Sequence, residues 1–260
     1  MSFKPFDLTG KVVLITGGNG GIGLGMAEAL VQAGAEVSVW GSNPDKNAAA
    51  KEQLMSYGPK ISTQCLDVAR EDDVARCFEA TLRDHGRVDG CFANAGIGGR
   101  GTRFDETTDA EWQRITSVNL DGAFYTFKYA TQHMRKRAEA GDPGGRLVAT
   151  ASLAAISGQA RGEHYAATKG GLVAMIKALA VEYARYGVTA HTILPGWIET
   201  AMTKENFLNP KFVDNVMRRI PMRRWGAPED FAAIAIYVMS DASAYHTADT
   251  FLIDGGYFTF

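Results

Sequence analysis

The sequence VVLITGGNGGIG, residues 12–23, passes from an apolar β-branched run into a cluster of glycines. The run 12–16 predicts a buried strand, and the amphipathic segment 22–33 after the glycines predicts a helix. Glycine lacks a Cβ atom, so the backbone of this turn can adopt positive φ and approach a phosphate group closely. The helix that follows presents free N–H groups and a partial positive charge. The segment therefore predicts a turn that binds the pyrophosphate of a nucleotide, and it lacks the G-x-x-x-x-G-K-[ST] pattern of a nucleoside-triphosphate loop.

The rest of the chain alternates short β-branched runs with longer amphipathic segments. Such alternation predicts parallel strands joined by right-handed crossovers, with helices on both faces of a doubly wound sheet. The predicted strands are 12–16, 37–40, 61–65, 88–93, 146–150, 188–194 and 251–253. The predicted helices are 22–33, 45–57, 71–85, 109–138, 165–186 and 228–240. No segment resembles an interdomain linker, so we expect residues 1–260 to form a single α/β, Rossmann-type domain with about seven strands.

Composition argues against several kinds of partner. A net charge of −2 over 260 residues gives no electrostatic reason to expect nucleic acid. No apolar run approaches the length of a membrane span, and residues 1–9 lack the features of a signal peptide. The cysteines (Cys65, Cys77 and Cys91) and the five histidines show no disulfide or metal-ligand spacing. We therefore expect a cytoplasmic protein without a metal, whose cysteines are small buried side chains in a reducing compartment.

Tyr165 and Lys169 stand four residues apart in a predicted helix, so their side chains share one face. A free tyrosine has a pKa of about 10, and a nearby cation favours the phenolate, so this pair suits proton transfer to or from an oxygen. Ser152 follows the fifth strand, at the edge where open parallel sheets place their sites. His164 adjoins Tyr165, but adjacent helical residues point about 100° apart, so we assign it no chemical role.

Several short motifs recur in one order along the chain and together carry a family resemblance. The glycine turn has the spacing T-G-x-x-x-G-x-G, and Asn94-Ala95-Gly96 follows the fourth strand. The further motifs are the set Asn119, Ser152, Tyr165 and Lys169, the segment Pro195-Gly196-x-x-x-Thr200, the stretch 224–230 (RWGAPED) and Asp254-Gly255-Gly256. By these motifs the chain resembles the classical short-chain dehydrogenase/reductase family over nearly its whole length.

The resemblance implies roles for named residues. Asn119, Ser152, Tyr165 and Lys169 would form the catalytic set, with Tyr165 as general acid/base and Asn119 holding a water that relays protons from Lys169. Lys169 would also bind the nicotinamide ribose, and the resemblance further implies a homotetramer. The residues implied to bind the cofactor are Gly17, Asn19, Gly21, Ile22, Gly23, Ser42, Asn43, Asp67, Val68, Asn94, Ala95, Gly96, Tyr165, Lys169, Pro195, Gly196, Ile198 and Thr200.

The end of the second predicted strand bears on the choice between NAD and NADP. An acidic residue there accepts a hydrogen bond from the ribose 2′-OH of NAD, whereas a basic residue accommodates the 2′-phosphate of NADP. Gly41 stands at this point, so no carboxylate repels a phosphate, and Ser42, Asn43 and Lys46 can donate to one. Gly20 argues the other way, because many NADP-using relatives carry a basic residue there. The sequence slightly favours NADP(H) over NAD(H).

We expect an NAD(P)-dependent oxidoreductase that acts on a small ketone or secondary alcohol. A substrate lid is expected at about 196–221, and apolar side chains there and after Ser152 suit a hydrophobic or mixed carbonyl compound. These side chains are Leu153, Ile156, Trp197, Met202, Phe207, Leu208 and Phe212; Arg100 and Arg103 could instead meet an anionic group. The alternative is a catalytically inactive cofactor-binding regulator of the same fold. A sugar-nucleotide epimerase is disfavoured because only residues 196–260 follow Pro195.

Overall fold

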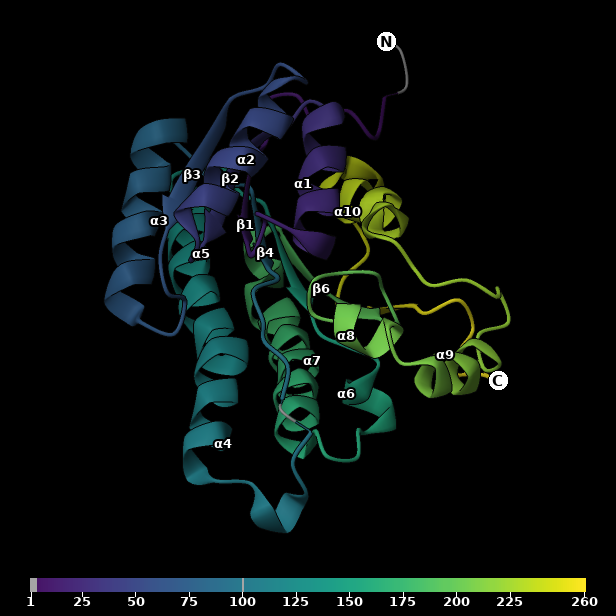
Figure 1. Ribbon diagram of the computed structural model, residues 1–260. Helices are drawn as coiled ribbons and strands as arrows, with labels where there is room; N and C mark the ends of the chain where they lie inside the picture. The colour runs from purple at the N-terminus through teal and green to yellow at the C-terminus, as the bar shows by residue number, and fades with distance from the viewer. Residues whose placement is uncertain (1–3, 100) are drawn as a thin grey trace.

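A seven-stranded parallel sheet forms the centre of the molecule (Figure 1). The computed structural model describes residues 4–99 and 101–260. Its strand order is β3-β2-β1-β4-β5-β6-β7, which reverses direction at β1 as in a doubly wound sheet. The strands are β1 (Val12–Thr16), β2 (Glu36–Gly41), β3 (Ile61–Cys65), β4 (Gly90–Ala93), β5 (Gly145–Thr150), β6 (Val188–Pro195) and β7 (Thr250–Ile253). The predicted fold class and the seven predicted strands are confirmed.

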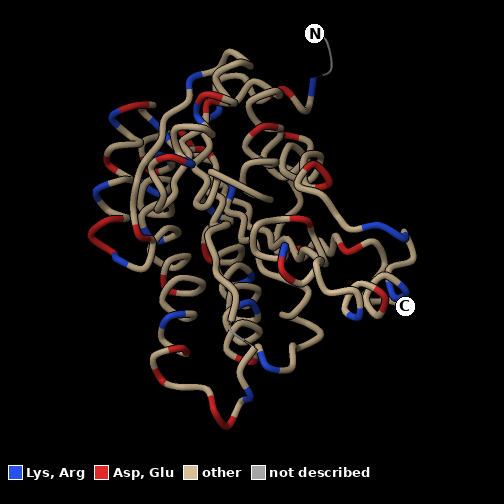
Figure 2. Tube along the Cα trace, viewed as in Figure 1, with Lys and Arg blue, Asp and Glu red and all other residues tan. Residues whose placement is uncertain are grey.

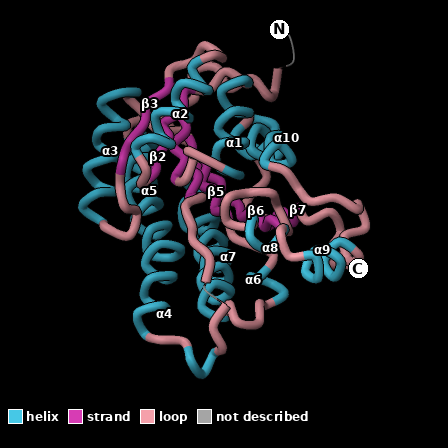
Figure 3. Tube along the Cα trace, viewed as in Figure 1, coloured by secondary structure: helices cyan, strands magenta, loops and turns pink. Residues whose placement is uncertain are grey.

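Helices cover both faces of the sheet (Figure 3). One face packs on α1 (Gly21–Gln32), α2 (Pro44–Met55) and α10 (Ala232–Met239), and the other on α3 (Glu71–His85), α5 (Gly122–Glu139) and α7 (Glu163–Tyr183). Leu172 and Ile176 of α7 are fully buried, as the helical apolar stripe predicts. Burial on both faces explains why the central strands β1 and β4 are almost continuously apolar.

Figure 2 shows acidic and basic residues interspersed along the outer helices. In α3, three acidic residues lie in the first turn and Arg83 and His85 in the last, an arrangement that complements the helix dipole. Among the described residues no helix is long and apolar enough to cross a membrane, and no cluster of three potential metal ligands occurs in that part of the chain.

The structure differs from the sequence-based predictions in several ways. The short helices α6 (Ala154–Ser157), α8 (Lys204–Phe207) and α9 (Pro210–Met217) were not predicted. The continuous helix expected over 109–138 is interrupted: α4 (Asp109–Thr116) passes into a π-helical turn, Ser117–Asp121, before α5 begins. The segment 228–240 begins with a 3₁₀ turn before α10. Cys65 is exposed, whereas Cys77 and Cys91 are buried, so the expectation of three buried cysteines is wrong for Cys65. Its position in β3, at the edge of the sheet, leaves its side chain uncovered.

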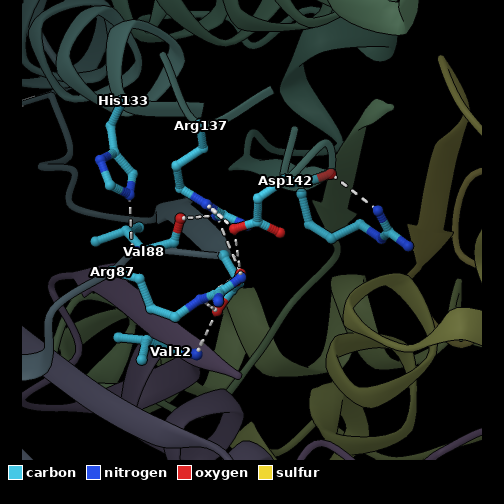
Figure 4. A network of polar contacts seen from close by, with 9 residues as sticks. Val12, Arg87, Val88, His133, Arg137 and Asp142 are labelled. Carbon is cyan, nitrogen blue, oxygen red and sulfur yellow. Dashed lines mark hydrogen bonds and ion pairs between the residues drawn. The ribbon is translucent and has the colours of Figure 1, made fainter. Parts of the chain in front are cut away.

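A polar network holds the amino-terminal edge of the sheet together (Figure 4). The buried carboxylate of Asp89 accepts from the Val12 amide at 3.0 Å and pairs with Arg87 at 2.7 Å and Arg137 at 3.1 Å. His133 accepts from the amide of Val88 at 3.2 Å. Burial, and secondarily the charge of Arg137, lowers the pKa of His133, which keeps its ring neutral and able to accept. The network thus fixes β1, β4 and α5 to one another at the edge opposite the nucleotide turn.

We expect Asp89→Ala to destabilise the fold by about 3 kcal/mol, because the buried Val12 amide would lose its acceptor and Arg87 and Arg137 would lose the buried carboxylate that they share. The measurement is urea unfolding at neutral pH. Asp142→Ala is the matched control: its carboxylate also pairs with Arg137, at 2.9 Å, but its side chain is 54% exposed, so the expected loss is below about 1 kcal/mol. Equal losses in the two variants would contradict this account of the network.

Candidate active site

A cleft of about 930 Å³ opens at the carboxyl ends of the strands. Its walls come from the glycine turn, the ends of β2 to β6 and the segment that follows β6. Almost all of the predicted site residues line it. The predicted residues that do so are Gly17, Asn19, Gly21, Ile22, Ser42, Asp67, Val68, Asn94, Ala95, Gly96, Ser152, Tyr165, Lys169, Pro195, Gly196, Ile198 and Thr200. Three others, Gly23, Asn43 and Asn119, do not line the cleft and lie behind or beside it.

The glycine turn is shaped by close approach of backbone to backbone. Gly17 has a φ of 64°, and a Cβ added to it would lie 3.0 Å from the Cα of Ala95. A Cβ on Gly23 would overlap the carbonyl oxygen of Gly17, so Gly23 shapes the turn from behind. The side chain of Asn94 donates to the carbonyl oxygens of Thr16, at 3.1 Å, and Gly17, at 3.2 Å. Asn94 therefore ties the end of β4 to this turn.

Of the residues at the end of β2 that were predicted to meet the adenosine ribose, some line the cleft and one does not. Ser42 and Lys46 line the cleft. Asn43 does not: its Oδ1 accepts from the amide of Lys46 at 2.9 Å and caps the amino terminus of α2. Sequence reasoning missed Asn47, which is buried and accepts from Asn19 at 2.7 Å. The sequence feature that could have identified Asn47 is its place in the first turn of the helix that follows the second strand.

Tyr165, Lys169 and Ser152 come together on one wall of the cleft. Lys169 is buried; its Nζ donates to the carbonyl oxygen of Thr150 at 2.8 Å and lies 5.6 Å from the centroid of the Tyr165 ring. Burial lowers the pKa of Lys169 to about 8. Burial raises the pKa of Tyr165, and a hydrogen bond with Ser152 opposes that rise. The chain by itself therefore favours the neutral phenol, whereas the sequence argument expected the cation to favour the phenolate.

Asn119 is fully buried in the π-helical turn. Its side chain accepts from the amide of Ile97 at 2.8 Å and donates to the carbonyl oxygen of the same residue at 3.0 Å. A Cβ added to Gly96 would lie 3.2 Å from the Nζ of Lys169 and 3.3 Å from the Oδ1 of Asn119. Gly96 thus leaves a space that both polar groups border, and Asn119 fixes the loop after β4.

The segment after β6 covers the far end of the cleft. It contains α8 (Lys204–Phe207) and α9 (Pro210–Met217), with Phe207 stacked on Trp225 at a centroid distance of 4.1 Å. Trp197 and Phe212, 4.9 Å apart, line the cleft and continue the aromatic group toward it. Of the other apolar residues predicted there, Leu153 and Met202 line the cleft, whereas Ile156, Phe207 and Leu208 do not.

Two arginines and a histidine near the substrate end of the cleft were also considered from the sequence. Arg103 pairs with Asp105 at 2.8 Å and is exposed, and Arg100 lies outside the described residues. His164 is buried, with its Nε2 3.6 Å from a carboxylate oxygen of Glu111, and it does not line the cleft. Tyr257, near the carboxyl terminus, lines the cleft and was missed, because a contact between such distant segments has no local sequence signal.

The fold and the site together define a doubly wound α/β protein in which a glycine turn, a tyrosine and a lysine line one cleft at the carboxyl ends of the strands. Residues 17–258 match a family model described as enoyl-(acyl carrier protein) reductase. The chain is 36% identical over 249 residues to a 3-oxoacyl-[acyl-carrier-protein] reductase of Chlamydia pneumoniae, covering 96% of this chain and 97% of that protein. It is 34% identical over 256 residues to levodione reductase of Leifsonia aquatica, covering 95% and 94%.

Solved structures of similar proteins superpose closely on this chain. The crystal structure of levodione reductase superposes with a TM-score of 0.90 at 34% identity, covering 95% of this chain and 97% of that one. A gluconate 5-dehydrogenase from Burkholderia cenocepacia J2315, in complex with NADP and tartrate, superposes with a TM-score of 0.92 at 30% identity over 98% of each chain. The protein belongs to the classical short-chain dehydrogenase/reductase family. It is an NAD(P)-dependent oxidoreductase of the class that acts on CH–OH and C=O groups.

The buried Lys169 gives a prediction about stability and pH. Its pKa is about 8 in the folded chain and about 10.4 in an unfolded one, so the unfolded state binds more protons between these values. Stability from this group is therefore lowest below pH 8 and rises as the pH approaches 10.4. We expect Lys169→Met to be more stable than the parent at pH 7, with the difference shrinking between pH 8 and 10. Urea unfolding at pH 7, 8, 9 and 10 measures it, and a pH-independent difference would argue against a depressed pKa.

Proposed function

We propose that the protein transfers hydride between a nicotinamide dinucleotide and a ketone or secondary alcohol, with Tyr165 as the general acid/base. The observation that carries the proposal is the meeting of Tyr165, Lys169 and Ser152 on one wall of the cleft, beside the glycine turn. The other site residues predicted from the sequence are proposed to bind the cofactor or to support residues that do.

The cleft fits a dinucleotide on physical grounds. The glycines of the turn leave free the space that Cβ atoms would occupy, and the amino terminus of α1 points toward the cleft. Gly17, Gly21 and Ile22 would hold the pyrophosphate, Asp67 and Val68 the adenine, and Ile198 and Thr200 the carboxamide. Gly196 packs against Asp254, where a Cβ would lie 2.6 Å from that side chain, which supports a fixed wall at the nicotinamide end. The bound cofactor would supply or accept the hydride.

Tyr165 suits the protonation step. Its raised pKa keeps the phenol protonated in the chain itself, so it can donate the proton to a carbonyl oxygen during reduction and recover it during oxidation. Ser152, whose Oγ also accepts from the amide of Ala154 at 3.1 Å, would hydrogen-bond the same substrate oxygen and stabilise the charge that develops there. Lys169 would bind the nicotinamide ribose and, through a water near Asn119, return protons from solvent.

We propose NADP(H) as the slightly preferred cofactor. Gly41 carries no carboxylate, while Ser42 and Lys46 face the cleft at this end. The relative from Burkholderia cenocepacia is described as a complex with NADP, which supports the same preference.

The substrate proposed is a small neutral carbonyl compound or alcohol with an apolar body. Trp197 and Phe212, both within the proposed lid at about 196–221, and Tyr257 supply aromatic surface at the far end of the cleft. The only charged side chains among the described lining residues are Lys46, Asp67 and Lys169, all assigned to cofactor or catalysis. An anionic substrate would find no dedicated partner among them.

We also propose a single-domain subunit that assembles as a homotetramer in the cytoplasm. Trp112 on α4 and Phe124 on α5 are 39% and 48% exposed, and Phe258 and Phe260 lie exposed at the carboxyl terminus. Apolar side chains of this size are typical of interfaces. The three free cysteines suit a reducing compartment.

Tyr165→Phe tests the assignment of the general acid. Loss of the phenol should lower kcat by about a thousandfold, the scale of positioned proton transfer, while the Kd for the cofactor changes little. Steady-state kinetics and a fluorescence binding titration measure the two effects. Activity within tenfold of the parent would exclude Tyr165 as the proton donor.

A substrate panel tests the reaction itself. With NADPH and with NADH, we expect turnover of cyclic and aryl ketones, and a lower kcat/KM for a ketose acid such as a ketogluconate. Faster turnover of the ketose acid would refute the neutral-substrate assignment. Inertness toward every compound, together with normal cofactor binding, would instead favour the inactive cofactor-binding regulator.

A further inference from the structure

The end of β2 holds a chain of three hydrogen bonds that the catalytic proposal does not use. Asn47, in the first turn of α2, is 4% exposed. Its Nδ2 donates to the carbonyl oxygen of Gly41 in β2, at 3.0 Å, and to that of Gln64 in β3, at 3.1 Å. Its Oδ1 accepts from the Nδ2 of Asn19, in the glycine turn, at 2.7 Å. One buried amide thus connects two strands to the turn that would hold the pyrophosphate.

Hydrogen-bond chemistry fixes the orientation of both amides. Main-chain carbonyl oxygens can only accept, so Asn47 must turn its NH₂ group toward Gly41 and Gln64 and its oxygen toward the cleft. That oxygen can likewise only accept, so Asn19 must offer it an N–H. An amide nitrogen carries two hydrogens, and Asn19 itself lines the cleft. The second N–H of Asn19 is therefore held in a set position over Gly41.

The same pair occupies the space above Gly41. A Cβ added to Gly41 would overlap the Nδ2 of Asn19 and lie 2.5 Å from the Oδ1 of Asn47. A carboxylate that reads a ribose 2′-OH would start from this Cβ. As long as the two amides are bonded to each other, position 41 cannot carry such a side chain without displacing them.

We propose that Asn47 is a positioning residue for cofactor selectivity: by fixing Asn19 over Gly41, it excludes a ribose-reading carboxylate and directs an N–H donor toward a 2′-phosphate. This inference rests on the proposed use of a nicotinamide cofactor, but not on catalysis. Asn47 acts only through Asn19, and its own side chain is shielded from the bound nucleotide.

The test is a double-mutant cycle read by binding rather than by turnover. The Kd values of NADPH and NADH are measured by fluorescence titration for the parent, Asn47→Ala, Asn19→Ala and the double variant. Since hydrogen bonds to a charged group are the stronger ones, we expect each single variant to lower the NADPH-over-NADH preference by about tenfold. The double variant should show no further loss, because Asn47 acts through Asn19. An unchanged or increased preference in Asn47→Ala, or additive losses in the double variant, would overturn the proposal.

Two controls separate positioning from stability. Ser62→Ala removes a buried hydroxyl that donates to Ser38 at 3.0 Å in the neighbouring strand, away from the cleft. It should lower the melting temperature and leave the NADPH-over-NADH preference unchanged. Asn47→Ser retains one hydroxyl donor for the strand carbonyls and replaces the alanine variant if that variant does not fold.

A second arm uses Gly41→Asp. With the asparagine pair intact, this substitution should weaken binding of both cofactors, because the new side chain has no room. In the Asn19→Ala/Asn47→Ala background it should instead shift the preference toward NADH. Clear NADH selectivity from Gly41→Asp alone would show that the pair does not exclude the carboxylate. Because every readout is a binding constant, a chain that fails to turn over any ketone would still decide this question.

Discussion

The backbone of the glycine turn lies so close to the end of β4 that no side chain fits between them. The hydroxyl of Thr16 accepts from the amides of Asn94 and Ala95, both at 3.0 Å, and Gly17 faces Ala95 across the remaining gap. These contacts join the two central strands at their carboxyl ends, where the strand order reverses. The walls of the cleft on either side depend on that junction, because β2 and β3 extend from β1 and β5 and β6 extend from β4.

The wall of the cleft that carries Tyr165 buries a charged group, Lys169, next to this junction. Lys169 reaches from α7 to the last carbonyl group of β5, and that single strong donor–acceptor contact offsets part of the cost of removing an ammonium from water. The network around Asp89 secures the opposite edge of the same strands with charges of its own. This network lies at the edge of the sheet opposite the cleft, so its carboxylates lie away from Tyr165 and Lys169.

Periodicity and short motifs predicted the sheet, most of its helices and most of the residues that line the cleft. They succeed at Gly17 or Tyr165 because the chemistry requires a particular residue at a particular spacing. They fail at Asn47 and Tyr257, whose importance arises from contacts between distant segments. They also placed Asn43 at the ribose, although an asparagine just before a helix serves equally well as an N-cap, and the local backbone decides between the two uses. The exposed Cys65 follows from its edge strand rather than from its residue type.

The π-helical turn at Ser117–Asp121 amounts to one extra residue absorbed within a helix that would otherwise run straight. Each residue advances a helix by about 100°, so this insertion sets the phase of everything that follows. The buried side of α5, with Phe127, Ala130 and Met134, is aligned with the sheet only because the turn precedes it. The same residues wound as a regular α-helix would rotate α5 by about 100° and present another of its sides to the core. The irregularity thus accommodates an extra residue, in the turn that holds Asn119, without rotating the buried side of α5 away from the sheet.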